Sequence, residues 1–489
     1  MSLYLHVYGI VALSYIVMHV VFGQLHHWRR RPRTALANLP SVAVIVPVYN
    51  EDPPLLDACL ASLAGQDHPA MTVIVVDDGS PNLAELEPVY HRYCERGWTI
   101  LRLSSNVGKR AAQRVGFDAA HTDVVVTIDS DTVLVSGDSL ATLTRSFLRR
   151  RVGAVTGAVG VINADTNLLT RLTSLRYWMA FHQERAAQSL FGVMLCCSGP
   201  FSAYRRSLID DVKDDYVQQT FLGKRCTFGD DRHLTNLVLS RGHRAIFDPD
   251  ARALTHVPDR LDAFLRQQVR WNKSFYREIL WSARFMHRRN PYLAVELALQ
   301  TFLPFMLLAA LVSVAVRSLA DPWVVATYAG IVAGIALLRC SYGALRTRSP
   351  RFLLFTVYGF VHVLLLIPTR LYAIATMGRT HWGTRGASSG AERPVADRND
   401  AEVMQAFPRQ RAAGGSTVMT VADSRAARTS VEPVPVVPRD VLPTMVRDRL
   451  GRWRPATVVT VPTQRPVPSG ETVTWAGWTP AAAAAPAGA

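Results

Sequence analysis

Four apolar segments constrain the fold of this chain more than any other feature. The first, Tyr4–Phe22, runs for about 19 residues without Asp, Glu, Lys or Arg, close to the length of helix that crosses the hydrocarbon core of a bilayer. Three further apolar segments follow at Leu293–Val316, Trp323–Leu338 and Phe352–Ile374. We therefore expect a membrane protein with an N-terminal transmembrane anchor over 1–28 and C-terminal transmembrane helices over 291–376.

The charges beside the first segment predict its orientation. The basic cluster Arg29-Arg30-Arg31-Pro32-Arg33 follows this segment, and no basic region precedes it. A cleaved signal peptide has the opposite order, so a retained anchor is favoured. Because basic flanks stay on the cytoplasmic side, the next domain is predicted to be cytoplasmic in a multi-pass protein of the plasma (inner) membrane.

Between the first two apolar segments, short runs rich in Val and Ile alternate with helical patterns. We predict strands at Val42–Val48, Thr72–Asp77, Thr99–Leu103 and Val124–Asp129. Helices are predicted between them at Pro54–Ala64, Leu83–Tyr93 and Gly108–Ala120. This β-α-β series predicts an α/β domain over 40–260, with a parallel sheet covered by helices on both faces. Ligands of such sheets bind at the carboxyl ends of the strands.

Bulk composition argues against two other kinds of protein. The net charge of +16 raises nucleic acid as a partner, but the arginines are scattered and no nucleic-acid module is recognisable. Anionic lipid headgroups and nucleotide substrates account for the charge as well, so we expect a lipid bilayer and no nucleic acid as partner. The six cysteines contain no Cys-x-x-Cys pair, and we expect no disulfides. Beyond about Thr384 the chain is rich in Ala, Pro, Val, Thr and Arg, which predicts a disordered tail over 384–489.

Acidic side chains stand at the ends of the predicted strands. Asp129 and Asp131 are two residues apart, so both carboxylates can leave a strand end on the same side and hold a divalent cation with a substrate diphosphate. Asp78 precedes Gly79 and can accept a hydrogen bond from a base or ribose, although a plain capped turn is the alternative. Lys109 and Arg110 open the third predicted helix and can meet a uridine or phosphate oxygen, unless they are only a basic helix start.

Two later motifs complete the set. Asp230 and Asp231 form a carboxylate pair in which Arg232 or His233 could hold one acid while Asp231 acts as general base, the alternative being a helix N-cap. Gln267-Gln268-Val269-Arg270-Trp271 supplies an amide, a guanidinium that can bind a diphosphate, and an indole on which a sugar can stack.

Two segments mix aromatic residues with Arg, Lys and Gln at helical spacing. They are Arg171–Phe191 and Leu261–Phe285, and they suit amphipathic helices in the membrane interface, the second forming an interfacial region over 261–290. Ordinary surface helices of the α/β domain are the alternative. Arg370 falls within the last apolar segment, where a charge is costly unless it faces protein or water.

Taken together, these motifs resemble the processive family 2 glycosyltransferases, the group of cellulose, chitin and hyaluronan synthases. The resemblance runs from about Val42 to Arg385. Finer matches are similar to the hyaluronan synthases, at Asn106–Arg110, Asp129–Thr132, Cys197–Pro200, Gly229–Asn236, Arg270–Glu278 and Trp382–Arg385.

This resemblance implies a GT-A type domain between transmembrane helices that transfers sugars with inversion. The implied donors are UDP-GlcNAc and UDP-GlcA, with Mg²⁺ or Mn²⁺ as cofactor, and the growing polysaccharide (hyaluronan) would leave through a channel in the membrane helices. The resemblance assigns donor binding to Asp78, Lys109, Arg110, Asp129, Gln267 and Arg270, and the metal to Asp131 with Asp129. It assigns acceptor binding to Trp271, Cys197, Ser198, Gly199 and Pro200, and catalysis to Asp231 with Asp230 beside it.

An alternative within the same family is a chitin-oligosaccharide synthase of the Nod-factor type. Its expected arrangement is one N-terminal span followed by three later ones, which matches the four apolar segments of this sequence. It also shares most of these motifs. Such an enzyme uses UDP-GlcNAc only. A membrane scaffold with an inactive transferase domain is disfavoured because every expected acid is present.

Overall fold

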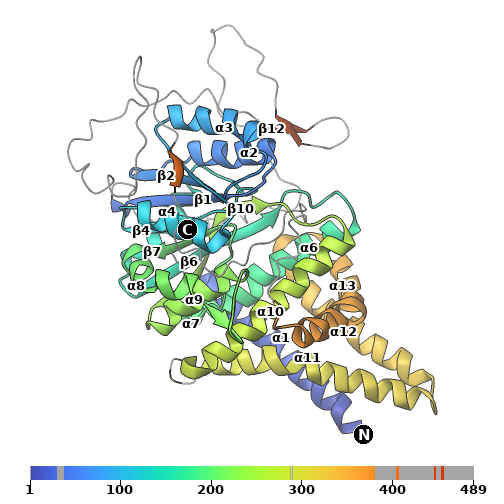
Figure 1. Ribbon diagram of the computed structural model, residues 1–489. Coiled ribbons are helices and arrows are strands. Elements are labelled where there is room, and N and C mark those ends of the chain that lie inside the picture. The colour runs from blue at the N-terminus through green and yellow to red at the C-terminus, as the bar shows by residue number, and fades with distance from the viewer. Residues whose placement is uncertain are drawn as a thin grey trace, which may run out of the picture.

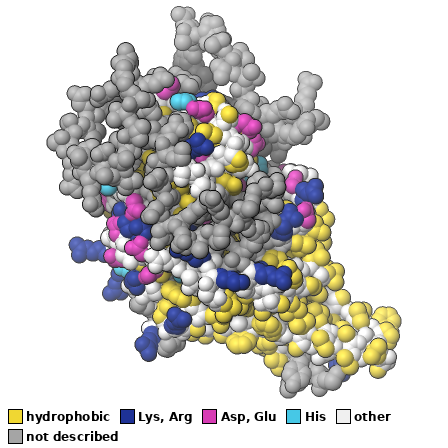
Figure 2. Space-filling view, viewed as in Figure 1, with side chains coloured by type: hydrophobic (Ala, Val, Ile, Leu, Met, Phe, Trp, Pro, Cys, Tyr) yellow, Lys and Arg dark blue, Asp and Glu magenta, His cyan; other side chains and the backbone are white. Residues whose placement is uncertain are grey.

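The computed structural model describes residues 2–29, 38–286, 288, 290–379, 403–406, 445–447 and 453–455. A polar α/β domain rests on a group of apolar helices, with the sheet above and α1, α11 and α12 extending below it in Figure 1. Figure 2 shows the lower part as a largely hydrophobic surface, with Lys and Arg side chains gathered where it meets the polar domain. Most of the tail predicted to be disordered, and the Trp382–Arg385 motif, lie outside the described residues.

A mixed nine-stranded sheet forms the centre of the domain, in the order β11-β3-β2-β1-β4-β7-β6-β10-β5. Its strands are β1 (Val42–Val48), β2 (Met71–Asp77), β3 (Thr99–Leu103), β4 (Val124–Thr127), β5 (Val133–Leu134), β6 (Val152–Val161), β7 (Ser202–Arg205), β10 (Arg244–Thr255) and β11 (Val403–Ala406). The first four strands pair in parallel, which confirms the predicted β-α-β series. Beyond them the sheet is not parallel throughout, because β7 pairs antiparallel with both β4 and β6. Two short hairpins stand apart, β8 (Thr220–Phe221) with β9 (Lys224–Arg225) and β12 (Met445–Arg447) with β13 (Trp453–Pro455).

Helices cover both faces of this sheet because its central strands are apolar on both sides. All seven residues of β1 are buried, as expected for a strand covered twice. The helices of the domain are α2 (Pro53–Ala64), α3 (Leu83–Glu95), α4 (Lys109–Ala119), α5 (Ser139–Thr144), the 3₁₀ helix η2 (Arg145–Leu148), α8 (Arg206–Val217) and α9 (Asp230–Ser240). Helix α4 lies close to β1 at Gly116, where an added Cβ would stand 2.5 Å from the Ile45 side chain. This approach fixes the start of α4, which carries Lys109, over the strand ends.

Four helical segments are long and apolar enough to cross a membrane: Val7–Trp28, Pro291–Ser318, Trp323–Thr347 and Pro350–Ala375. The first three belong to α1 (Ser2–Trp28), α11 (Pro291–Ser318) and α12 (Trp323–Thr347). The fourth is irregular and consists of the 3₁₀ helix η4 (Pro350–Phe355), α13 (Thr356–Val361), the π-helix η5 (His362–Leu366) and α14 (Ile367–Ala375). The structure therefore contains one early and three late helical segments of membrane-spanning length.

The segments expected at the membrane interface are helical, but part of their aromatic surface is buried in protein. They form α6 (Leu168–Met179), the π-helix η3 (Ala180–Arg185), α7 (Ala186–Phe191) and α10 (Leu261–Met286). Trp178 is buried, stacking on His182 at 4.9 Å and meeting Phe352 edge-on at 4.8 Å between ring centroids. Phe181 is buried as well. The Trp178 ring thus joins the α/β domain to η4 of the fourth apolar segment. Helical periodicity alone could not distinguish this contact from exposure to lipid.

Helix α1 is docked on the domain at backbone distance. A Cβ added at Gly23 would lie 3.2 Å from the carbonyl oxygens of both His182 and Gln183 in η3. The same helix is tied to α11 through Glu296, whose Oε1 lies 3.1 Å from Tyr15 Oη and 3.1 Å from His19 Nε2. Helix α1 is thus held to the π-helix by close packing and to α11 by hydrogen bonds.

Replacement of Gly23 by leucine tests this docking. Gly23→Leu forces α1 away from the η3 backbone, and an overpacked contact of this kind costs about 1–3 kcal/mol. We expect the unfolding temperature of the detergent-purified protein to fall by several degrees. Gly9→Leu is the matched control, because a Cβ at Gly9 on the same helix meets nothing within 4 Å. Equal unfolding temperatures for the two variants would contradict the docking.

Candidate active site

A cavity of about 680 Å³ lies between the strand ends, α9, α10 and the apolar helices. Most of the predicted site residues line it, namely Lys109, Asp129, Asp131, Ser198, Gly199, Pro200, Asp230, Asp231, Gln267, Arg270 and Trp271. Three predicted residues do not line it: Asp78, Arg110 and Cys197. The structure therefore brings the separate motifs of the sequence to one place.

Lys109 joins the two acidic clusters. Its Nζ lies 2.6 Å from Asp129 Oδ1, after β4, and 3.2 Å from Asp230 Oδ2, at the start of α9. Burial alone would lower the pKa of Lys109, but the two carboxylates raise it, so the amine stays charged. Burial would raise the pKa of Asp230, and the charges of Lys109 and Arg110 lower it instead. We expected Arg232 or His233 to hold one acid of the pair, and Lys109 does so.

Asp131 lies in an excess of negative charge. Burial, together with the carboxylates of Asp129 and Glu51, raises the pKa of Asp131 to about 7. Its Oδ1 accepts a hydrogen bond from Thr255 Oγ1 at 3.1 Å. A cation placed beside Asp129 and Asp131 would relieve this repulsion. Within the described residues, no group of three or more His, Cys, Asp and Glu could hold a metal by itself.

Asp231 differs from its neighbour in having no lysine partner. Its Oδ2 accepts from the Cys196 thiol at 3.3 Å, and its Oδ1 accepts from the Arg232 amide at 2.7 Å. Burial and the adjacent charge of Asp230 raise the pKa of Asp231. The pair thus separates into one strongly ionised acid and one better proton acceptor, a division that acid–base sites use.

The three residues outside the lining hold its loops in place. Asp78 accepts from the amides of Val107 and Gly108 at 2.7 and 3.0 Å, which fixes the turn before Lys109. Arg110 donates to the carbonyls of Tyr216 and Phe228, both at 3.1 Å. Cys197 is buried, and its amide donates to Thr235 Oγ1 at 2.8 Å. Their direct contact with a donor or acceptor stays a prediction.

Helix α10 presents Trp271 to the cavity. Its next two residues, Asn272 and Lys273, form hydrogen bonds with the end of the last span. The Trp271 side chain is 45% exposed, and its ring lies 6.4 Å from that of Tyr177 between centroids. Asn272 Oδ1 accepts from Arg370 Nε at 3.0 Å, and Lys273 Nζ donates to the Arg379 carbonyl at 3.2 Å. The charge of Arg370, costly in lipid, faces protein here.

The following turns of α10 hold the acidic pair, a role that the sequence did not reveal. Arg277 Nη2 donates to the Phe228 carbonyl at 2.5 Å. Glu278 is 1% exposed and lies 3.1 Å from both His233 Nδ1 and Asn236 Nδ2 of α9. Burial would raise the pKa of Glu278, but His233 and the hydrogen bonds lower it to about 2. The signal available in the sequence was the acidic residue Glu278 within an amphipathic helix, which could have indicated a buried polar contact.

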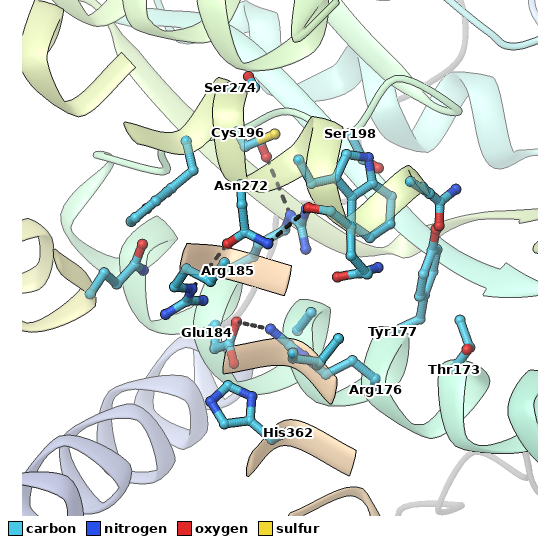
Figure 3. A pocket seen from close by; sticks show the side chains of 18 of the residues that line it. Thr173, Arg176, Tyr177, Glu184, Arg185, Cys196, Ser198, Asn272, Ser274 and His362 are labelled. Atoms are coloured by element: carbon cyan, nitrogen blue, oxygen red, sulfur yellow. Dashed lines mark hydrogen bonds and ion pairs between the residues drawn. The ribbon is translucent and has the colours of Figure 1, made fainter. Parts of the chain in front are cut away.

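The cavity continues from the acidic clusters into the apolar helices, where a second polar group was also missed. Figure 3 follows the lining from Cys196 and Ser198 to Arg176, Glu184 and His362. Arg176 Nη2 lies 3.2 Å from Glu184 Oε2, and Arg339 of α12 pairs with the other oxygen of the same carboxylate. The described part of the passage therefore has paired charges rather than a purely apolar wall.

Comparison with known proteins places this site in a family. The model of "Glycosyl transferase family 2" matches residues 43–213. An N-acetylglucosaminyltransferase of Neorhizobium galegae is 39% identical over 374 residues, covering 75% of this chain and 86% of that protein. The chain belongs to glycosyl transferase family 2. An N-acetylglucosaminyltransferase of Sinorhizobium fredii is 39% identical over 371 residues, covering 75% of this chain and 89% of its own length.

A solved structure of the mannosyltransferase PcManGT from Pyrobaculum calidifontis, in complex with GDP-Man and Mn²⁺, is also similar. It has a TM-score of 0.49 and 23% identity, and the match covers 73% of this chain and 99% of that one.

These relatives correct one prediction. The assignment to the hyaluronan synthases, with UDP-GlcA as a second donor, is wrong, because the similar proteins found over most of the chain are named N-acetylglucosaminyltransferase. The motifs behind that prediction surround the acidic clusters and Trp271. These motifs alone do not separate one donor sugar from another.

The turn that carries the acidic pair gives a direct test of the site. Gly229 has φ +80°, and an added Cβ would lie 2.0 Å from Ser274 Oγ on α10. Gly229→Ala must therefore displace Asp230 and Asp231, and a misplacement of about 1 Å lowers turnover on the order of 100-fold. Glycosyl transfer by the purified variant measures this.

Gly223→Ala is the matched control for that variant. Gly223 has φ +74°, but a Cβ there meets nothing within 4 Å. It carries the same backbone strain, about 1–2 kcal/mol, without the collision. If both alanine variants kept the wild-type rate, the contact between this turn and α10 would not position the acids.

Proposed function

We propose that this protein is a membrane-embedded N-acetylglucosaminyltransferase of the chitin-oligosaccharide type, which extends an acceptor sugar from UDP-GlcNAc alone. The names of the relatives support this donor, and one early span with three late ones is the arrangement expected of such enzymes. The observation that carries the proposal is the single cavity that joins two acidic clusters to an exposed tryptophan and continues among apolar helices.

The donor end of the cavity is the part near the strand ends. Asp129 and Asp131 would hold Mg²⁺ or Mn²⁺, and two carboxylates suffice because such a cation takes its remaining ligands from water and phosphates. The bound cation would neutralise the negative charge that develops on the departing UDP. Arg270 and Gln267 lie on the cavity wall, where the guanidinium is suited to a diphosphate. Lys109 and the turn held by Asp78 face the same end.

Asp231 is proposed as the general base. The acceptor hydroxyl loses its proton to the Asp231 carboxylate while its oxygen forms the bond to the anomeric carbon and the bond to UDP breaks, with inversion. Asp230 is the weaker proton acceptor of the pair, because the charges of Lys109 and Arg110 lower its pKa. Trp271 offers a flat apolar face to the acceptor sugar, with Ser198, Gly199 and Pro200 on the same wall.

The rest of the oligosaccharide would occupy the part of the cavity lined by the spans. The side chains of Arg176, Glu184 and Arg339 there provide hydrogen bonds to hydroxyl and acetamide groups. The arginines that follow the first span favour a catalytic domain on the cytoplasmic side of the inner membrane.

Radiolabel incorporation by the purified enzyme tests donor and base together. UDP-GlcNAc alone is expected to give a chitinase-sensitive product, and UDP-GlcA should be neither required nor incorporated. Asp231→Asn is expected to lower kcat by about 10²–10⁴-fold, since general base catalysis has this size. Asp211→Asn, at an exposed position of α8, is the control for loss of one carboxylate. A strict need for a second donor, or full activity of Asp231→Asn, would refute the proposal.

The pH dependence of kcat tests the base in a different way. Asp231 must be ionised to accept a proton, so kcat rises with pH and levels off above its raised pKa. The Cys196 thiol donates to this carboxylate and favours its ionised form. Cys196→Ala should therefore move the acid limb upward by about half a pH unit, since the thiol is a weak donor. Cys226→Ala, at a buried thiol elsewhere, should leave the limb in place; a limb unmoved in both variants would argue against Asp231.

A further inference from the structure

A second cavity, of about 360 Å³, lies apart from the active site and is strongly cationic. Among the described residues, no side chain lines both cavities. Six arginines line the second one: Arg29, Arg145, Arg149, Arg150, Arg151 and Arg244. The one carboxylate in its lining, Asp248, already pairs with Arg145 at 3.1 Å.

Among the described residues, the other five guanidinium groups have no acidic partner. In the part of the chain that the structure describes, none of Arg29, Arg149, Arg150, Arg151 and Arg244 forms a salt bridge. Their proximity has an electrostatic effect, since burial and then the charges of Arg29, Arg149 and Arg151 lower the pKa of Arg244. Five like charges around one hollow repel one another, and an anion in the hollow would remove that cost. Guanidinium groups bind phosphate oxygens bidentately, so a phosphate group suits this lining.

The position of the cavity indicates where such a phosphate comes from. His26 and Arg29 line it from the end of α1, and the apolar span of that helix ends at Trp28. The hydrogen bond between His26 Nε2 and Ser189 Oγ, 3.1 Å long, fixes this end against α7. Phospholipid headgroups lie directly beyond the hydrocarbon core, at the level where a span ends. Figure 2 shows Lys and Arg side chains where the apolar surface meets the polar domain.

We propose that this arginine-lined cavity binds the phosphate of an anionic phospholipid headgroup. The site anchors the catalytic domain to the bilayer at the end of its first span, independently of sugar transfer. Anionic lipids are the class selected, because the zwitterionic headgroup of phosphatidylcholine brings a cation into a cavity that already holds uncompensated positive charge. Binding stabilises the folded protein by RT ln(1 + [L]/Kd), where [L] is the concentration of free lipid.

The test uses the full chain purified in an uncharged detergent. Dioctanoyl phosphatidylglycerol, dioctanoyl phosphatidylcholine and inorganic phosphate are titrated separately, and the affinity and the unfolding temperature are measured. Phosphatidylglycerol is expected to bind and to raise the unfolding temperature. Phosphatidylcholine and free phosphate should bind at least about tenfold more weakly, a difference of about 1.4 kcal/mol in binding free energy. Inorganic phosphate binding as tightly as the lipid would overturn the assignment to a lipid.

Two charge-matched triple variants locate the binding. Arg149→Gln with Arg151→Gln and Arg244→Gln removes three charges from the cavity and should weaken phosphatidylglycerol binding at least about tenfold. Arg92→Gln with Arg96→Gln and Arg241→Gln removes three exposed charges elsewhere and should leave the affinity unchanged. Equal affinities of both variants, whether retained or reduced, would overturn the proposal.

A measurement on the unaltered protein covers the case in which the cavity variant does not fold. Raising the ionic strength from about 0.05 to about 0.5 M shortens the Debye length several-fold, so phosphatidylglycerol binding should weaken at least tenfold. An affinity that does not depend on salt would show that apolar contact with the acyl chains, rather than the arginines, holds the lipid.

Discussion

The contact of Lys109 with two carboxylates is the interaction on which the rest of the site depends. One of these acids follows β4 and the other begins α9. Without the lysine between them, the two carboxylates would repel each other where the sheet and the helix meet. A buried ion pair contributes little net stability, but an unpaired buried charge is strongly unfavourable. Lys109 therefore matters for arrangement: it brings the two clusters together, keeps Asp230 ionised and leaves Asp231 as the acid with the raised pKa.

Helix α10 performs the corresponding task on the membrane side. Along little more than two turns it presents Trp271 to the cavity, bonds Asn272 to Arg370 of the last span, and holds α9 through Glu278. The side chains of successive residues point in different directions around a helix, so one segment can serve three neighbours. The cavity wall at Trp271, the last span and the acidic pair consequently share one rigid support.

Much of the fold could be predicted because its signals are local. The strands β1 to β4 and the helices between them begin and end within two residues of their predicted bounds, since apolar runs alternate with turn residues there. The spans followed from composition in the same way. The meeting of the motifs at one edge followed from the rule for parallel strands.

The parts that could not be predicted depend on contacts between distant residues. The bridge made by Lys109, the hold of Glu278 on α9 and the pairing of Glu184 with Arg339 each join residues far apart in the chain. Trp178 was expected at the membrane surface because helical periodicity shows an apolar face but not what covers it. The donor sugar was misassigned because the motifs behind the resemblance do not by themselves specify the sugar of the donor.

The close approach of α1 to the π-helix at Gly23 couples the position of α1 to the lining of the cavity. A spanning helix changes its tilt when its hydrophobic length and the membrane thickness differ. Backbone contact leaves no side chain between the two helices to absorb such a movement. The π-helix also carries Glu184, which pairs with arginines inside the cavity. A change in the tilt of α1 would therefore be passed to the π-helix and to the part of the cavity that Glu184 lines.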